Sequence, residues 1–396
     1  MPNRPIAPAN RVANVRYAVR DVAVLADQLR REGRRMLYLN IGDPNPFGFR
    51  PPQHVLDAVH AAMEANKNGY APSDGIEEAT SAINRDAAAR GIGPIVHTWV
   101  GNGCSEVIDM ALSALADPGD NVLVPSPGYP LYTALLAKLG VDARAYHLDE
   151  ANGWQPDVED IARLIDANTR AIVVINPNNP TGSVTGEPTL RKIVELAVAN
   201  DVVIFADEIY DRLLFDGAVH TPLGSIDPRA CVLSLGGLSK NWVLPGFRIG
   251  WGVMSGPPEQ LTGYINAIQQ LGRARLSANH PEQYGIAPAL DGPQDHLTKM
   301  IPQLVQRRDA AMKLLATIPD ITCVVPQGAF YAFPRIHRPV DDATWCRELM
   351  RETAVVTVPG SGFGQREGTQ HFRIVLLPDV EQIEEACAGI ARFMAR

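Results

Sequence analysis

Residues 169–182, TRAIVVINPNNPTG, carry the pattern that decides the fold. A nearly continuous apolar, β-branched run ends there in a turn rich in asparagine and proline. The pattern returns at 120–130 (DNVLVPSPGYP), 201–211 (DVVIFADEIYD) and 230–240 (ACVLSLGGLSK), and helical periodicity such as that of 189–201 lies between the runs. Apolar runs that alternate with helices are typical of a mostly parallel sheet that is covered on both faces. The sequence therefore predicts an α/β fold.

The chain changes character on either side of this region. Residues 1–50 contain a proline-rich arm and a polar helix candidate, and residues 291–396 resemble a small α+β unit that ends in a helix. We expect residues 51–290 to form a large domain, and both chain ends to contribute to a small one.

The composition excludes several classes of function. The net charge of −8 leaves no basic surplus for binding nucleic acid. The five cysteines are widely spaced and form no CxxC pair, so we expect neither a disulfide framework nor a metal site. The sequence shows neither a signal peptide nor an apolar run of ~18 residues, and we therefore expect a cytoplasmic protein without a membrane span.

Unusual polar residues follow the predicted strands, where ligands of parallel sheets bind. Gly103, Cys104 and Ser105 precede a helix and would offer backbone amides to an anion, although an ordinary turn with a serine N-cap also explains them. Tyr129 could cover a flat ligand or pack within its own loop. Asn179 could offer an amide donor or belong to a plain Asn/Pro turn.

The remaining strand ends carry charged residues. Asp207 needs a cationic partner at the mouth of a buried strand, unless it caps a helix. In GGLSKNWVLPGFRIGW (236–251), Lys240 lies among apolar residues that would lower its pKa and favour a Schiff base, whereas most lysines simply reach the surface. Arg248 could bind a phosphate or form a salt bridge. Taken together, these residues are the set that pyridoxal phosphate requires.

These motifs resemble those of a known family. GLSKNWVLPGFRIGW, NPNNPTG, DEIYDRL, GNGCSEVI and LNIGDPNPFGF occur in the order found in fold-type I, pyridoxal 5'-phosphate-dependent aminotransferases of the aspartate/alanine aminotransferase superfamily. The resemblance covers essentially the whole chain and is closest to the bacterial alanine (glutamate–pyruvate) aminotransferases. It implies a large domain with a seven-stranded type of sheet, a small domain, and a homodimer with shared active sites.

The resemblance also implies roles for individual residues. Lys240 would form the Schiff base with the cofactor and transfer the substrate proton. Asp207 would pair with the pyridinium nitrogen, Tyr210 and Asn179 would bind the 3-hydroxyl oxygen, and Tyr129 would stack on the ring.

Further residues would bind the phosphate and the substrate. The phosphate ligands would be Gly103, Cys104, Ser105, Ser239, Arg248 and, from the neighbouring subunit, Tyr70. Arg373 would bind the substrate α-carboxylate, with Asn179 and Gly42 beside it. Two positions depart from the family pattern: Gly237 stands where many relatives have serine, and Cys104 lies in the middle of the phosphate cradle.

We expect a ping-pong transamination between L-alanine and 2-oxoglutarate. Arg275 and Arg50 are candidates for binding a distal carboxylate. The alternatives are a broad aromatic/branched-chain or aspartate aminotransferase and a C–S β-lyase. A transcription regulator on the same fold is disfavoured, because residues 1–50 are too short and proline-rich for a DNA-binding domain.

Overall fold

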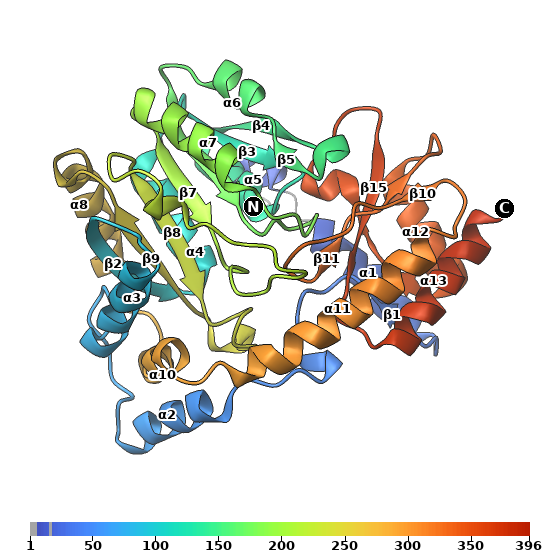
Figure 1. Ribbon diagram of the computed structural model, residues 1–396, viewed down its shortest axis with the longest axis horizontal. Helices are drawn as coiled ribbons and strands as arrows, with labels where there is room; N and C mark the ends of the chain where they lie inside the picture. The colour runs from blue at the N-terminus through green and yellow to red at the C-terminus, as the bar shows by residue number, and fades with distance from the viewer. Residues whose placement is uncertain (1–5, 16–17) are drawn as a thin grey trace, which may run out of the picture.

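The computed structural model describes residues 6–15 and 18–396 of the chain. Within these ranges, eight strands form the central sheet, in the order β2-β9-β8-β7-β6-β3-β4-β5 (Figure 1). The strands are β2 (Ile95–Asn102), β3 (Asn121–Ser126), β4 (Asp142–Asp149), β5 (Gln155–Pro156), β6 (Thr169–Ile175), β7 (Val203–Asp207), β8 (Val232–Gly237) and β9 (Ile249–Ser255).

The direction of the strands confirms the predicted mostly parallel α/β sheet. β4, β3, β6, β7 and β8 are mutually parallel, whereas β9 runs antiparallel to both β2 and β8. The sheet has one strand more than the expected seven, because the two-residue β5 adds an antiparallel edge to β4.

Each buried strand packs against helices on both of its faces, which explains its continuous apolar run. In β6, Ile172 and Val174 join one hydrophobic cluster, whereas Ala171, Val173 and Ile175 join another. The first cluster includes α6 (Val158–Leu164) and α7 (Glu187–Ala199), and the second includes α4 (Cys104–Leu115), α5 (Leu131–Leu139) and α8 (Pro258–Arg275). A third cluster, at the β2–β9 edge, includes α2 (Gln53–Glu64), α3 (Glu77–Ala89) and α10 (Ile286–Asp291), with α9 (His280–Gln283) beside them.

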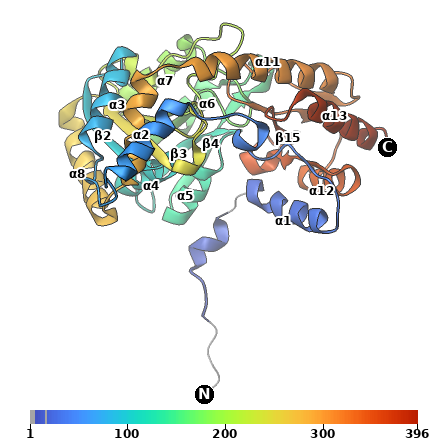
Figure 2. The same ribbon diagram turned by 90° about the horizontal axis from the view of Figure 1, so that it is seen from below.

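Both ends of the chain build a second, smaller unit, at the opposite end of the molecule from α8 (Figures 1 and 2). In it, β1 (Leu37–Tyr38) pairs in parallel with β13 (Val355–Val356). An antiparallel sheet contains β10 (Ile321–Thr322), β11 (Tyr331–Ala332), β12 (Arg335–Ile336), β14 (Val358–Pro359) and β15 (Gln370–Val375). Its helices are α1 (Ala18–Arg31), α12 (Asp342–Thr353) and α13 (Val380–Met394).

The long helix α11 (Asp295–Leu315) connects the two units. Leu297 and Leu304, in its first half, pack in a cluster with Tyr210, whereas Ala311 and Leu315 pack with the small unit. Short 3₁₀ turns complete the described elements: η1 (Asn10–Asn14), η2 (Asn45–Phe47), η3 (Glu150–Asn152), η4 (Leu223–Ser225), η5 (Pro245–Phe247) and η6 (Gly360–Phe363). None of the helices in the described part of the chain combines the length and the apolar character needed to cross a lipid bilayer.

The register of the parallel strands brings the predicted functional residues to one edge of the sheet. Ile175, the last residue of β6, lies beside Asp207, the last residue of β7, and Asp207 lies beside Leu235 of β8. The turns that follow these strands therefore meet at the same place, between the sheet and the small unit.

Candidate active site

A cavity of about 830 Å³ opens at this edge of the sheet. It brings together most of the residues that the sequence predicted to bind cofactor or substrate. Those that line it are Gly42, Cys104, Ser105, Tyr129, Asn179, Asp207, Tyr210, Ser239, Lys240, Arg248 and Arg373. They come from segments that are far apart in the chain, and the small unit supplies Arg373 from β15.

Lys240 lies in the turn after β8, and its amine is buried. Its Nζ donates a hydrogen bond to the carbonyl oxygen of Gly42 at 2.8 Å. Burial lowers the pKa of Lys240 to about 8; the positive charges of Arg373 and Arg248 also lower it, and Asp43 opposes them. The amine is therefore available in its neutral, nucleophilic form much closer to neutrality than an exposed lysine.

Asp207 is the last residue of β7, and only 4% of it is exposed. The hydroxyl of Tyr132, on α5, donates a hydrogen bond to its Oδ2 at 3.1 Å. Its Oδ1 is buried and has no hydrogen-bond partner among the described residues. Burial raises the pKa of Asp207 to about 6. The residues up to Arg212 form a turn instead of a helix, so Asp207 is not the N-cap that one interpretation of the sequence allowed.

Two tyrosines meet on another side of the cavity. The hydroxyl groups of Tyr210 and Tyr331 share a hydrogen bond of 2.8 Å. A Cβ atom at Gly42 would lie 2.2 Å from the Tyr331 hydroxyl oxygen, so only glycine fits there. Tyr331 lines the cavity, but sequence reasoning missed it, because nothing in QGAFYAFP (327–334) marks one aromatic residue above the others.

Arg373 provides a buried guanidinium group in the cavity wall. Its Nη1 donates to Oδ1 of Asn179 at 3.1 Å, and its Nη2 donates to the carbonyl oxygen of Asn40. The guanidinium carbon lies 4.6 Å from the centre of the Tyr331 ring. A cation held in this way, beside Asn179, suits a carboxylate ligand because guanidinium can bind both carboxylate oxygens.

Gly103 and Arg248 lie close together at another part of the site. Gly103 precedes α4 with a φ of 79°, and Arg248 has a φ of 53°, so both adopt left-handed backbone conformations. A Cβ atom at Gly103 would lie 2.5 Å from Nη2 of Arg248. The residue that precedes the helix is thus Gly103, and not the serine cap that the simpler interpretation required. A helix N-terminus next to a guanidinium group is well suited to bind phosphate.

Gly237 and Cys104 pack against each other behind this cradle. A Cβ atom at Gly237 would lie 2.8 Å from the carbonyl oxygen of Ile249 and 3.3 Å from Sγ of Cys104. The Cys104 thiol itself donates to the carbonyl oxygen of Gly236 at 2.8 Å, and burial raises the pKa of the thiol. The two departures from the family pattern are therefore linked, since the cysteine side chain fills space close to where a serine at position 237 would project.

Besides Gly103, which lies next to Arg248 but not in the lining itself, three predicted residues lie outside the cavity lining. Tyr70 is 83% exposed, so within this chain it contributes nothing to the site. Arg275 pairs with Glu106 at 2.5 Å and donates to backbone carbonyl groups, and Arg50 lines a separate surface hollow. Neither arginine is placed to bind the distal carboxylate of a substrate in this cavity.

The side chains in the cavity fit pyridoxal phosphate. Oδ1 of Asp207 is a buried acceptor that needs a donor, as a protonated pyridine nitrogen would supply. Lys240 is a buried amine, and the absence of a side chain at Gly103 leaves an approach to Arg248 for a phosphate.

Comparison with known proteins agrees with this geometry. The family described as aminotransferase class I and II matches residues 34–390. The glutamate–pyruvate aminotransferase AlaA of Haemophilus influenzae is 42% identical to this chain, over 98% of either protein.

Two solved structures have nearly the same fold. An aminotransferase from Escherichia coli superposes with a TM-score of 0.96 at 39% identity, with 99% of each chain covered. An alanine aminotransferase from Pyrococcus furiosus superposes with a TM-score of 0.94 at 37% identity, with 98% of this chain and 100% of that chain covered. Fold, site and sequence agree, and the chain belongs to the class I and II aminotransferase family.

Proposed function

We propose that this aminotransferase moves the amino group of L-alanine to 2-oxoglutarate in a ping-pong reaction. The observation that carries the proposal is the convergence of Lys240, Asp207 and Arg373 on one cavity. The amino donor is inferred from the relatives, because those named above include a glutamate–pyruvate and an alanine aminotransferase.

One group of residues in the cavity is proposed to bind the substrate carboxylate, and another group the phosphate of the cofactor. Arg373 and Asn179 hold the α-carboxylate of the amino acid, which orients its Cα–H bond toward Lys240. The phosphate of the cofactor is held by Gly103, Ser105, Arg248 and the neighbouring residues Cys104 and Ser239.

The central residues act on protons and charge. Pyridoxal phosphate, when bound, supplies an electron sink that stabilises negative charge at the substrate Cα. Asp207 keeps the pyridine nitrogen protonated, and Tyr210 with Asn179 binds the 3-hydroxyl oxygen while Tyr129 covers the ring. With cofactor and substrate bound, the neutral amine of Lys240 would act as the base that removes the Cα proton and then as the acid that returns it. The amino acid leaves as a 2-oxo acid before the second 2-oxo acid enters.

We further propose a cytoplasmic homodimer. Tyr70 supports the dimer because a tyrosine that is 83% exposed in one chain is free to reach the phosphate of a partner. The proposed division into a large domain (51–290) and a small domain (291–396 with part of 1–50) is supported by the β1–β13 pairing and by the separate hydrophobic clusters.

A panel of half-reactions tests the proposal. Purified protein with bound pyridoxal phosphate is mixed with L-alanine, L-glutamate, L-aspartate, L-valine or L-phenylalanine, and the absorbance of the cofactor is followed. We expect alanine and glutamate to convert it to the pyridoxamine form, and Lys240→Ala to be inactive with all five. Conversion by phenylalanine or valine alone would favour the aromatic/branched-chain alternative, and release of pyruvate from cystathionine without a 2-oxo acid would favour the β-lyase.

A further inference from the structure

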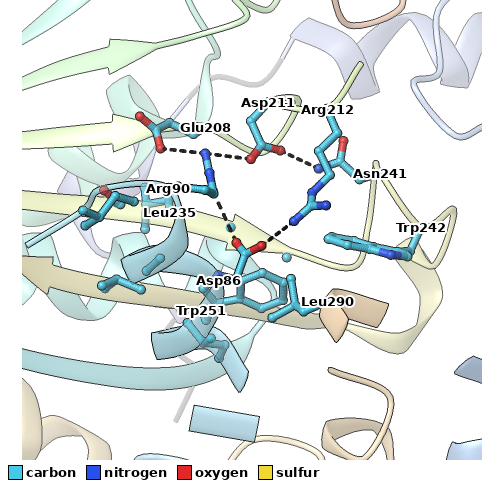
Figure 3. Close-up of a pocket in the computed structure, with 17 residues that line it drawn as sticks. Asp86, Arg90, Glu208, Asp211, Arg212, Leu235, Asn241, Trp242, Trp251 and Leu290 are labelled. Atoms are coloured by element: carbon cyan, nitrogen blue, oxygen red, sulfur yellow. Dashed lines mark hydrogen bonds and ion pairs between the residues drawn. The ribbon is translucent and has the colours of Figure 1, made fainter. Parts of the chain in front are cut away.

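A second polar cluster lies next to the residues that face the cofactor. Glu208, Asp211 and Asn241 directly follow, in the chain, the residues to which we assign the pyridinium contact, the 3-hydroxyl contact and the Schiff base. All three line a small cavity of about 30 Å³ that is distinct from the large one (Figure 3). The turn after β7 thus presents Asp207 and Tyr210 to the cofactor and the residues that follow each of them to a shared polar cluster, and the turn after β8 does the same with Lys240 and Asn241.

Arg90 contacts the turn after β7, and Asp211 connects that turn to the one after β8. Arg90 follows α3, and its Nη2 lies 2.8 Å from Oδ2 of Asp211 and 3.6 Å from Oε2 of Glu208, while its Nη1 lies 3.6 Å from Oδ2 of Asp86. The other carboxylate oxygen of Asp211 accepts a hydrogen bond from Nδ2 of Asn241 at 2.7 Å. Figure 3 shows the resulting chain of contacts from Arg90 through Asp211 to Asn241.

Both the burial and the charge of the cluster favour a single arrangement. Only 3% of Glu208 and 3% of Asn241 are exposed. Burial disfavours the charge of Arg90, but Asp211, Glu208 and Asp86 outweigh it and raise the pKa of its guanidinium group. The Arg90 side chain is 27% exposed and that of Asp211 9%, so the chain is a partly buried ion pair that continues into the hydrogen bond between Asp211 and Asn241. Such a chain tolerates little displacement, because a misplaced group leaves another without its partner.

Few contacts fix the position of the Lys240 amine directly. The side chain is long and flexible, and its amine donates one hydrogen bond to a backbone carbonyl oxygen and lies 5.7 Å from the centre of the Phe330 ring. The position of the amine is therefore decided largely by the turn that carries it, and Asn241 is the next residue of that turn.

We propose that the chain Arg90–Asp211–Asn241 is a positioning element that holds the Lys240 turn in register with the ends of β7 and β8. The inference rests on the proposed role of Lys240. None of the three residues touches substrate or cofactor, and all three act through the residues beside them.

The substitution Asn241→Ala tests this with two ligands. Pyridoxal phosphate can react with Lys240, whereas pyridoxamine phosphate has no aldehyde and binds only through its ring and phosphate. For Asn241→Ala apoprotein, we expect the affinity for pyridoxal phosphate to fall about tenfold, and that for pyridoxamine phosphate to change by less than about twofold. At saturating cofactor, kcat should fall roughly tenfold or more, with KM for alanine little changed.

A similar trio elsewhere in the sheet provides a matched control. Nδ2 of Asn121, at the start of β3, donates to Oδ1 of Asp166 at 2.9 Å, and Nη1 of Arg144 lies 2.6 Å from Oδ2 of Asp166. These residues lie at the opposite ends of the strands from the site. Both Asn121→Ala and Asn241→Ala should lower the melting temperature, but Asn121→Ala should leave the ratio of the two affinities unchanged.

The possible outcomes separate the inference from the proposed function. If both ligands weaken equally in Asn241→Ala, or if neither weakens, the positioning role is wrong. If Asn241→Ala does not fold, Asn241→Ser is measured in its place, with the same expectations. Borohydride reduction of the wild-type holoenzyme should attach the cofactor to Lys240. Attachment elsewhere would overturn the proposed function and this inference with it.

Discussion

The hydroxyl group of Tyr132 donates a hydrogen bond to one carboxylate oxygen of Asp207, at 3.1 Å, and leaves the other oxygen buried and without a hydrogen-bond partner among the described residues. The carboxyl group is thus held from one side and kept in a nonpolar setting, which raises its pKa to about 6. An acceptor in this state favours a ligand that brings its own charged donor.

The apoprotein should therefore lose stability as the pH rises. A pKa near 6 in the folded protein, against about 3.9 in the unfolded chain, means that the folded state binds the proton more tightly. Below about pH 4, Asp207 therefore does not lower the free energy of unfolding. Above about pH 6, it lowers that free energy by the full amount of about 3 kcal/mol. Asp207→Asn apoprotein should be more stable than wild type by up to this amount near pH 8 and equal to it near pH 4, as measured by urea unfolding.

The hydrogen bond from Tyr132 should shift this pH dependence. Because the bond lowers the pKa of Asp207, Tyr132→Phe should raise that pKa further and extend the loss of stability to higher pH. Tyr146→Phe is the matched control, since the buried Tyr146 hydroxyl donates only to the carbonyl oxygen of Val173, at 2.7 Å. It should lower stability equally at all pH values between about pH 4 and pH 8. If the stability of the two variants depended on pH in the same way, the Tyr132 hydrogen bond would not be what lowers the pKa of Asp207.

A side chain at Gly103 should block the phosphate site. In Gly103→Ala, the new Cβ would meet Nη2 of Arg248, and the φ of 79° would add strain. Gly119→Ala carries similar strain, of roughly 1–2 kcal/mol, but has nothing within 4 Å of its Cβ. We expect both variants to lose stability, and Gly103→Ala alone to bind pyridoxal phosphate at least about tenfold more weakly in an equilibrium titration of the apoprotein. Equal affinity in the two variants would exclude the steric explanation.

Restoring the common serine at position 237 should damage the protein instead of improving its hold on the phosphate. The Cβ of Gly237→Ser would collide with the carbonyl oxygen of Ile249, and we expect a loss of about 1–3 kcal/mol in unfolding free energy. Gly246→Ser, where a Cβ has open space, should be nearly neutral. Tighter binding of pyridoxal phosphate by Gly237→Ser would show that the backbone makes room and that this packing argument fails.

Lys240 should react with acylating reagents at an unusually low pH. In the apoprotein, its labelling by acetic anhydride, followed by peptide mass spectrometry, should have a midpoint near pH 8. In denaturant the same lysine should require about pH 10.4, because burial no longer disfavours its charge. Asp43→Asn should lower the midpoint further, since the Asp43 carboxylate raises the pKa of Lys240. A midpoint that is the same in folded and denatured protein would show that the amine is not buried.

The sequence was sufficient for the sheet and for most of the cavity lining, because both depend on local patterns. An apolar run followed by a polar turn identifies a strand and its carboxyl end, and parallel strands bring those ends together. Lys240, Asp207 and Asn179 could be selected in this way before any contact was known. The contacts that tune them could not, since Tyr132 and Tyr331 lie 75 and 121 positions from their hydrogen-bond partners.

The two arginines proposed for a distal carboxylate illustrate the same limit. In the sequence, Arg275 is simply a cation near a proline- and asparagine-containing turn, whereas in the structure it is committed to Glu106 and to the backbone around the phosphate cradle. Whether a cation serves a ligand or the protein depends on which carboxylate lies within a few ångströms of it, and the spacing of residues along the chain does not contain that information.

By itself, then, the sequence determined the α/β sheet, the family and most of the residues that line the cavity, because periodicity and strand-end motifs are encoded locally. Only the tertiary structure decided which groups surround them. The orphan oxygen of Asp207, the contact between Gly103 and Arg248, and the link from Arg90 to Asn241 all arise from side chains of distant segments that are buried together. Because these contacts are shielded from water, their electrostatic interactions and hydrogen bonds are stronger. They therefore shift the pKa values of the groups involved and fix their positions.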